Sequence, residues 1–160
     1  MYDWNFDSPG LKTWLLLLQA RDAMDREMRV ALSGQSVTAE QLRVLFFLSH
    51  YPDGATVDEI AIWCFRDKGS VIQQLSRMEN KGLVSRRKQP HDKYVFSHLT
   101  SEGEEQLKLS AKTSTAMIKQ IEQQFSEKDV QSLNEDLKRI RDSSLARLGL
   151  QAIPPRKANN

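Results

Sequence analysis

Residues 67–99, DKGSVIQQLSRMENKGLVSRRKQPHDKYVFSHL, decide the fold, because a well-bounded helix is followed there by a hairpin. Asp67 can cap a helix over 68–80, and Gly82 follows that helix at the position where a glycine most often ends one. With a short helix expected just before it, this helix forms a helix-turn-helix candidate.

The second half of the stretch predicts two strands, over 83–87 and 94–99, joined by a loop over 88–93. The loop contains a proline, which fits a hairpin tip better than a paired strand. A long basic hairpin contributes nothing to a hydrophobic core. Its charge suits contact with the phosphates and the minor groove of DNA beside a docked helix. Helix-turn-helix followed by hairpin predicts a winged helix.

Charge is unevenly distributed along the chain, whose 160 residues carry a net charge of only +2. Between residues 66 and 93, eight lysines and arginines face three acidic residues, which gives +5 and leaves −3 for the remainder. Such a cluster is either a solvated surface or an anion-binding one. Its place on the helix and hairpin favours a nucleic-acid partner.

The helix over 68–80 has an apolar side that should pack inward and a polar side. The apolar side comprises Val71, Ile72, Leu75 and Met78, and the polar side Ser70, Gln73, Gln74, Arg77 and Lys81. The polar side is either a plain solvent face or a recognition surface for the major groove. Glutamine can pair with adenine, arginine can reach guanine or phosphate, and serine allows close approach.

Other helices are predicted by hydrophobic periodicity and by capping pairs, in which a hydroxyl and a side chain three residues on satisfy exposed N–H groups. These pairs are Thr38–Gln41, Thr56–Glu59, Ser101–Glu104 and Ser126–Asp129. The helices are expected over 11–33, 38–50, 57–64, 101–125 and from 126 onward, with a turn at 51–54.

The last helix carries a seam that resembles a coiled coil, formed by Val130, Leu133, Leu137, Ile140 and Ser144. The seam packs either within this chain or against a second chain. A winged helix offers little core to cover long flanking helices, which favours a seam shared by two chains. The expected fold is therefore mainly α with a small β-hairpin. Its regions are an N-terminal dimerisation helix over 1–36, a winged helix-turn-helix over 37–100, C-terminal dimerisation helices over 101–150 and a flexible tail over 151–160.

Several function classes receive no support from the sequence. No nucleophile motif, phosphate loop or metal-ligand spacing is present, so we expect no enzyme activity, cofactor or metal. No apolar run is long enough to cross a membrane. A single cysteine, Cys64, excludes an internal disulfide and points to the cytoplasm. That thiol is either a buried structural group or a redox sensor.

Four segments carry a resemblance in their order and spacing: TAEQLRVLFFLSH, TVDEIAIWC, DKGSVIQQLSRMENKGLVSRR and PHDKYVFSHLTSEGEEQL. Over about residues 38–107 the chain resembles the MarR family of bacterial transcription regulators. The resemblance implies a homodimer with intertwined terminal helices that binds double-stranded DNA at a pseudo-palindromic operator. It further implies a repressor, or occasionally an activator, released when a small and often aromatic molecule binds between the lobes and the dimerisation helices.

By matching positions, the resemblance places Arg77 as a phosphate contact and Asp92 as the wing aspartate. The family commonly has an arginine two residues after that aspartate, where this chain has Tyr94, so other wing residues are expected to supply the charge. The full set of expected DNA-contacting residues is Lys68, Ser70, Gln73, Gln74, Arg77, Arg87, Lys88, Asp92 and Lys93.

Four aromatic residues near the expected junction of the lobe and the terminal helices are either ligand-pocket residues or simply core: Trp14, Phe47, Tyr51 and Trp63. Two alternatives to a ligand-released repressor remain. One is a winged helix that binds an acidic protein partner, and the other is a regulator that senses redox state through Cys64.

Overall fold

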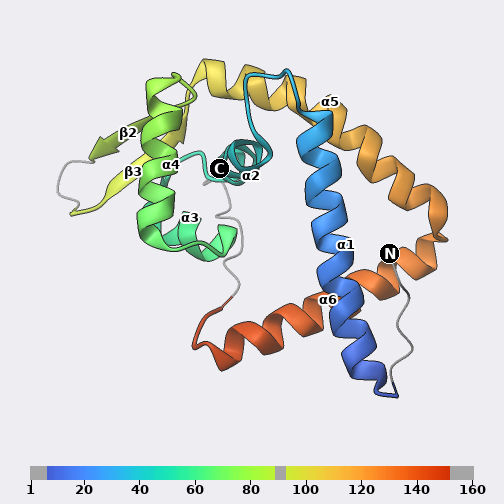
Figure 1. The fold of residues 1–160 in the computed structure, drawn as a ribbon. Helices are drawn as coiled ribbons and strands as arrows, with labels where there is room; N and C mark the ends of the chain where they lie inside the picture. Colours follow the sequence, from blue (N-terminus) through green and yellow to red (C-terminus); the bar gives the residue numbers. More distant parts are fainter. Residues whose placement is uncertain (1–6, 89–92, 152–160) are drawn as a thin grey trace.

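The computed structural model describes residues 7–88 and 93–151, and it consists of a winged-helix lobe carried on three long helices (Figure 1). The long helices are α1 (Pro9–Ala31), α5 (Ser101–Gln124) and α6 (Glu127–Arg147). The lobe contains α2 (Ala39–Ser49), β1 (Ala55–Thr56), α3 (Val57–Cys64), α4 (Lys68–Asn80), β2 (Val84–Lys88) and β3 (Val95–Leu99). The mainly helical winged-helix fold predicted from the sequence is confirmed.

Helix starts follow the predicted caps with one exception. Complete capping boxes form at Thr38 and Thr56, while Asp67 and Ser126 each accept a hydrogen bond from a backbone N–H three residues on. The prediction that Ser101 caps α5 is wrong. Thr100 is the cap, with its hydroxyl accepting from the Gly103 N–H at 3.0 Å.

The sheet has three antiparallel strands in the order β1-β3-β2. In the hairpin, Val84 pairs with Leu99 and Lys88 with Val95. The sequence did not predict β1, which adds Ala55 opposite Ser97 on the other side of β3. This short strand ties the segment before α3 to the wing.

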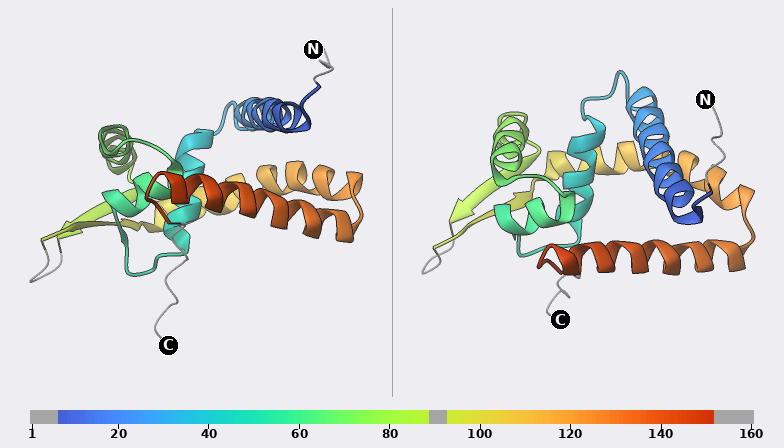
Figure 2. Two further views of the ribbon diagram at one scale, coloured as in Figure 1. Left: turned by 90° about the horizontal axis from the view of Figure 1, so that it is seen from below. Right: turned by 60° about the horizontal axis from the view of Figure 1, so that its bottom comes forward.

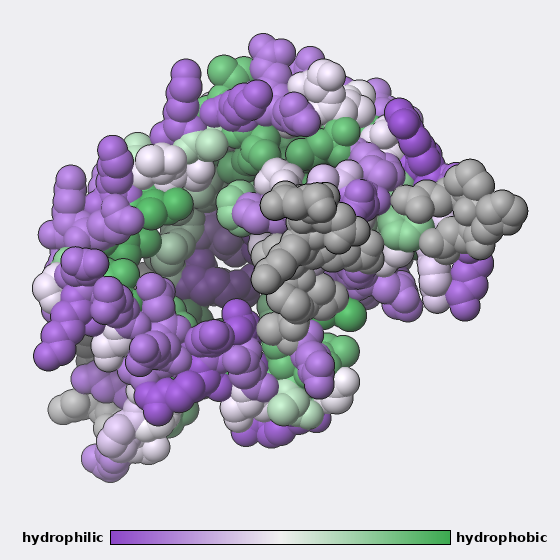
Figure 3. All heavy atoms as spheres, turned by 180° about the vertical axis from the view of Figure 1, so that it is seen from behind, coloured by the Kyte–Doolittle hydropathy of each residue, from purple (hydrophilic) through white to green (hydrophobic). Residues whose placement is uncertain are grey.

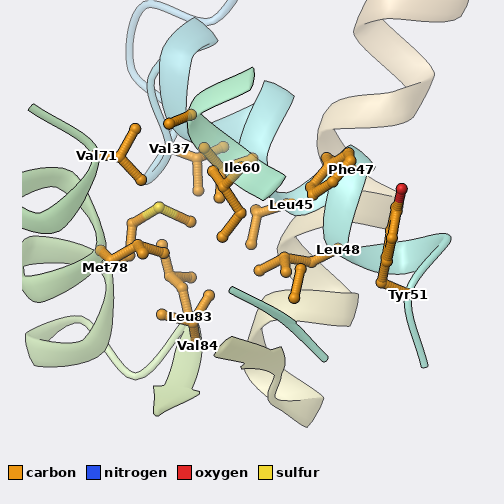
Figure 4. Close-up of a cluster of buried hydrophobic side chains, with 14 residues drawn as sticks. Val37, Leu45, Phe47, Leu48, Tyr51, Ile60, Val71, Met78, Leu83 and Val84 are labelled. Carbon is orange, nitrogen blue, oxygen red and sulfur yellow. The ribbon is translucent and has the colours of Figure 1, made fainter. Parts of the chain in front are cut away.

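The core of the lobe lies between α2, α3, α4 and the start of the hairpin (Figure 4). Val71 and Met78 of α4 are buried there with Leu45 and Ile60 from α2 and α3. Burial of an aliphatic side chain contributes roughly 1.5–3 kcal/mol, so these anchors fix one face of α4 to the lobe. The opposite face is thereby left exposed.

The long helices form an arm that extends away from α4 and the hairpin. Helix α5 leads out from the lobe, α6 returns along the arm, and α1 lies across it (Figures 1 and 2). Among the described residues, no helix is both long and apolar enough to cross a membrane.

Candidate nucleic-acid interface

Helix α4 is held rigidly at its first turn. Asp67 accepts hydrogen bonds from the backbone N–H and the hydroxyl of Ser70, at 2.8 and 2.6 Å. These bonds lower the pKa of the exposed Asp67 carboxyl, so this cap is ionised at neutral pH. A fixed first turn gives the residues after it defined positions, as a reading surface requires.

Most of the predicted polar face of α4 is exposed. Ser70, Gln73 and Arg77 point away from the core side, as the periodicity predicted. Lys68 is also exposed, but its ammonium lies 2.9 Å from a carboxylate oxygen of Asp58. Lys68 is therefore tied to α3, while Arg77 has no ion pair in the described part of the chain.

Two residues of α4 lie on the side opposite to the one predicted. Gln74 is half-buried, and its Nε2 is buried without a hydrogen-bond partner among the described atoms. Ile72 was expected to pack inward, yet its side chain is 45% exposed. The helix is rotated so that Gln74 joins the row of Val71, Leu75 and Met78, which places its amide away from the reading surface.

The wing presents further basic residues beside α4. Arg87 and Lys88 are exposed on β2, opposite Phe96 and Val95 of β3. Lys93 is also exposed, with its ammonium 5.0 Å from the centroid of the Tyr94 ring. Such a cation–π contact holds a lysine over an aromatic face without neutralising its charge. The predicted wing residue Asp92 lies outside the described residues, as do residues 152–160 of the tail predicted over 151–160.

Helix α4 and the hairpin lie at the same end of the molecule, away from the arm (Figures 1 and 2). The arrangement therefore brings the exposed side chains of α4 and the charges of the wing onto one end of the lobe. A helix narrow enough for the major groove, with a basic hairpin beside it, is the geometry of a duplex-binding surface.

A second feature is a cavity of about 550 Å³ between the lobe and α5. The cavity was not predicted as such, because its walls come from segments far apart in sequence. Basic side chains outnumber acidic ones among its lining residues, which are Leu48, Ser49, Tyr51, Pro52, Ser85, Arg87, His98, Leu99, Glu104, Leu107 and Lys108.

Of the four aromatic residues predicted for a pocket, Tyr51 lines this cavity. Phe47 is buried, with its ring centroid 4.3 Å from that of Tyr51 and 5.0 Å from that of Trp63. Trp14, by contrast, is 56% exposed on α1. The structure thus gathers Phe47, Tyr51 and Trp63 into one cluster of ring contacts that, among the described residues, does not include Trp14. Of the three, Phe47 and Tyr51 lie at the end of the core away from α4 (Figure 4).

Cys64 is half-buried at the end of α3 and packs against the core. Burial raises the pKa of its thiol, and the positive charges of Arg43 and Arg66 only partly oppose that effect. A raised pKa lowers the thiolate fraction that peroxide would attack. The placement favours a structural thiol over a redox sensor. Among the described residues, no group of three or more histidine, cysteine, aspartate or glutamate side chains could hold a metal ion.

Comparison with known proteins agrees with this geometry. Residues 35–93 match the family model described as MarR family. The chain is 34% identical over 91 residues to the HTH-type transcriptional regulator FarR of Neisseria gonorrhoeae, an alignment that covers 55% of this chain and 60% of FarR. The chain therefore spans less than two thirds of the length of that relative.

Two solved structures share the fold. AbsC, a MarR family transcriptional regulator from Streptomyces coelicolor, superposes with a TM-score of 0.77 at 23% identity, over 89% of this chain and 97% of AbsC. MepR of S. aureus, in its complex with DNA, gives a TM-score of 0.73 at 24% identity, over 81% of this chain and 95% of MepR. At these identities the likeness concerns the fold.

Proposed function

We propose that this chain, whose residues 35–93 match the MarR family model, is a sequence-specific DNA-binding transcription regulator. The observation that carries the proposal is the exposed row of Ser70, Gln73 and Arg77 on the anchored α4, beside the basic strand β2. FarR, AbsC and MepR are transcription regulators by name, and MepR was crystallised with DNA. Enzyme chemistry has no counterpart among these relatives.

In the proposed complex, α4 lies in the major groove and the wing follows the adjacent backbone. Gln73 can form two hydrogen bonds to an adenine edge, while Arg77 lies on the flank and can reach a phosphate. Arg87, Lys88 and Lys93 attract phosphates around the wing. Because each phosphate contact releases counterions, operator affinity should fall steeply as salt concentration rises.

We further propose that the regulator is a homodimer joined through its arm, so that two copies of α4 enter successive major grooves about 34 Å apart. The arm carries exposed apolar residues on all three helices, among them Leu16, Ile118 and Ile140. Viewed from behind, hydrophobic residues reach the surface in patches between hydrophilic ones (Figure 3). A surface of this kind is typical of a protein that buries it against another chain.

The proposed effector is a small aromatic acid that binds the cavity between the lobe and α5. Arg87, His98 and Lys108 line the cavity, with Glu104 as the only acidic lining residue described. Arg87 also lies on the wing strand, so a bound carboxylate would engage a charge that otherwise attracts DNA. A ligand releases DNA only when it prefers a lobe arrangement that does not fit the operator.

The experiment that tests the regulator is selection from a random pool of duplexes about 30 base pairs long, enough for two half-sites one helical turn apart. The Kd values of the protein for the enriched duplexes and for unselected DNA are then measured at one fixed salt concentration. Enrichment of a two-fold-symmetric site with a much lower Kd supports a dimeric regulator. Weak, salt-sensitive binding without any enriched site would refute the proposal and favour a winged helix that binds an acidic protein partner.

Substitutions on α4 should separate affinity from specificity. Arg77→Ala is expected to weaken binding to operator and random DNA alike, and to reduce the slope of log K against log salt by about one per subunit. Gln73→Ala is expected to relax preference at one base pair per half-site, by roughly 1–3 kcal/mol of discrimination. Filter-binding titrations on single-base operator variants measure both effects.

The matched control is Gln131→Ala, which removes an exposed glutamine from α6 and should change neither quantity. If Gln73→Ala lost affinity equally on operator and on random DNA, a base-reading role for Gln73 would be refuted.

A single substitution also tests the effector site. Lys108→Ala should leave operator binding intact without ligand, because Lys108 lies on α5 at the cavity and away from α4. The benzoate concentration needed for half-release should rise about tenfold, since a hydrogen bond to a charged group is worth about 1.5–3 kcal/mol. Fluorescence anisotropy of labelled operator provides the measurement.

Lys112→Ala serves as the control, because that exposed lysine is on the same helix but does not line the cavity. If benzoate and ring-substituted benzoates left the wild-type complex intact, the proposed ligand class would be wrong.

A further inference from the structure

Ile72 is an exposed aliphatic side chain on the helix that we propose reads DNA. Its neighbours Val71, Leu75 and Met78 are buried in the core, whereas 45% of the Ile72 side chain is accessible to solvent. The exposed part of this isoleucine gains nothing from the core of its own lobe. The question is therefore which apolar surface it contacts when the protein functions.

The proposed dimer does not account for this exposure. Most of the other exposed large apolar residues belong to α1, α5 and α6, which form the arm. Helix α4 lies at the opposite end of the molecule, beside the wing (Figures 1 and 2). A second copy that covers the arm would leave Ile72 uncovered.

Small neighbouring residues on α4 allow the side chain of Ile72 to contact the surface of a partner. Gly69 and Ser76, three and four residues away, occupy the same flank of the helix and are both small and exposed. Next to that flank lies Gln73, and beyond it Ser70 and Arg77 form the polar flank. The exposed face of α4 thus combines an apolar projection with hydrogen-bonding groups, in a region of net positive charge.

We propose that Ile72 contacts the C5-methyl group of a thymine in the major groove. That methyl is the apolar group that a base pair presents there, and aliphatic side chains recognise it by van der Waals contact. The inference rests on the proposed DNA-binding function and specifies part of its sequence preference. Each half-site would carry one thymine at the position that Ile72 reaches, next to the base pair that Gln73 reads.

Replacement of thymine by deoxyuridine tests this contact, because uracil lacks only the methyl group. The selected operator is synthesised with each thymine replaced in turn, at symmetric positions of both half-sites. For the wild-type protein we expect one symmetric replacement to raise the Kd about tenfold, as expected for two methyl groups that leave apolar contact. For Ile72→Ala the same replacement should change the Kd less than twofold, whereas Ile72→Val should keep most of the sensitivity.

Circular dichroism and thermal unfolding of the variants provide the folding control, and the exposed side chain should make both substitutions mild. If no replacement affects the wild type, or if Ile72→Ala stays as sensitive as the wild type, the proposed contact is refuted while DNA binding stands. If selection enriches no operator at all, the proposed function fails and this inference fails with it. The proposal is supported if removal of the thymine methyl raises the Kd of the wild type and of Ile72→Val but not that of Ile72→Ala.

Discussion

Replacement of Leu133 and Leu137 by glutamate is expected to convert the protein to a monomer and to weaken operator binding by more than about a hundredfold. Both side chains lie on the predicted seam of α6, and they are 40% and 38% exposed in the single chain. In a dimer, both subunits would bury their copies of these two side chains in the interface. Burial of an unpaired carboxylate is so unfavourable that the interface would dissociate instead.

The expected loss of DNA binding follows from the geometry of two half-sites. A monomer holds one recognition helix and loses the second set of phosphate and base contacts, together with the effective concentration that tethering provides. Light scattering coupled to size-exclusion chromatography measures the mass, and anisotropy titration measures the Kd. A cooperative thermal unfolding transition should remain in the variant, because the lobe has its own core.

A control variant combines Gln131→Glu with Lys138→Gln, which produces the same change in net charge on the opposite face of α6. That variant should remain a dimer with nearly normal affinity. A dimer that persisted in the Leu133→Glu, Leu137→Glu variant at micromolar concentration would show that the seam is not the interface.

Local chemistry explains why the helix starts could be predicted from the sequence. A cap such as Thr38, Thr56 or Asp67 satisfies backbone N–H groups within its own first turn, so the signal and its effect lie within four residues. The predicted cap of α5 was wrong by one residue, and the reason is a contact with a distant part of the chain. Thr100 donates its hydroxyl to the Gly82 carbonyl, eighteen residues earlier, and this contact selects it over Ser101.

The rotation of α4 illustrates a second limit of prediction from the sequence. Successive residues on a helix differ by about 100°, so residues at the border between buried and exposed sides are hard to assign from the periodicity alone. Gln74 and Ile72 both lie near that border. Their hydrophobicity predicted that Ile72 is buried and Gln74 exposed, whereas in the structure Ile72 is exposed and Gln74 half-buried. Helix α4 packs against both α3 and β2, so the exposure of these two residues depends on the whole lobe.

The cavity could not be predicted for a related reason. Its walls combine the end of α2, both strands of the hairpin and the first turns of α5. Tyr51 was predicted because it is aromatic and near the expected junction of the lobe and the terminal helices. Arg87 had been assigned to DNA only, while His98 and Lys108 carry no local signal that would mark a pocket.

Gly103→Ala is expected to lower stability by about 2–4 kcal/mol, in the range of overpacked or strained sites. A Cβ at this position would lie 2.0 Å from the backbone oxygen of Leu83 and 3.1 Å from its carbonyl carbon. Backbone atoms cannot rotate away as a flexible side chain can. The Leu83 carbonyl also accepts the N–H of Thr100 at 3.3 Å, so the first turn of α5 and the start of β2 would have to separate.

This joint connects the arm to the wing, so its displacement should affect DNA binding as well as stability. Leu83 immediately precedes β2, and a shift there would move the wing relative to α4. Thermal unfolding should show a Tm lower by roughly 5–15 °C for a chain of this size. Operator affinity measured well below that Tm should also fall, because the wing and α4 no longer fit the duplex together.

Gly10→Ala is the matched control, since it makes the same chemical change inside another helix. A Cβ at Gly10 meets only the Ser8 hydroxyl oxygen, at 3.9 Å, which is ordinary van der Waals contact. Alanine lowers the conformational entropy of the unfolded chain, so this variant should gain up to about 1 kcal/mol of stability. Opposite signs for the two substitutions would establish that the close approach of α5 to Leu83, and not helix propensity, requires glycine at position 103. If both variants were equally stable, α5 and β2 would have room to separate, and the joint would not fix the position of the wing.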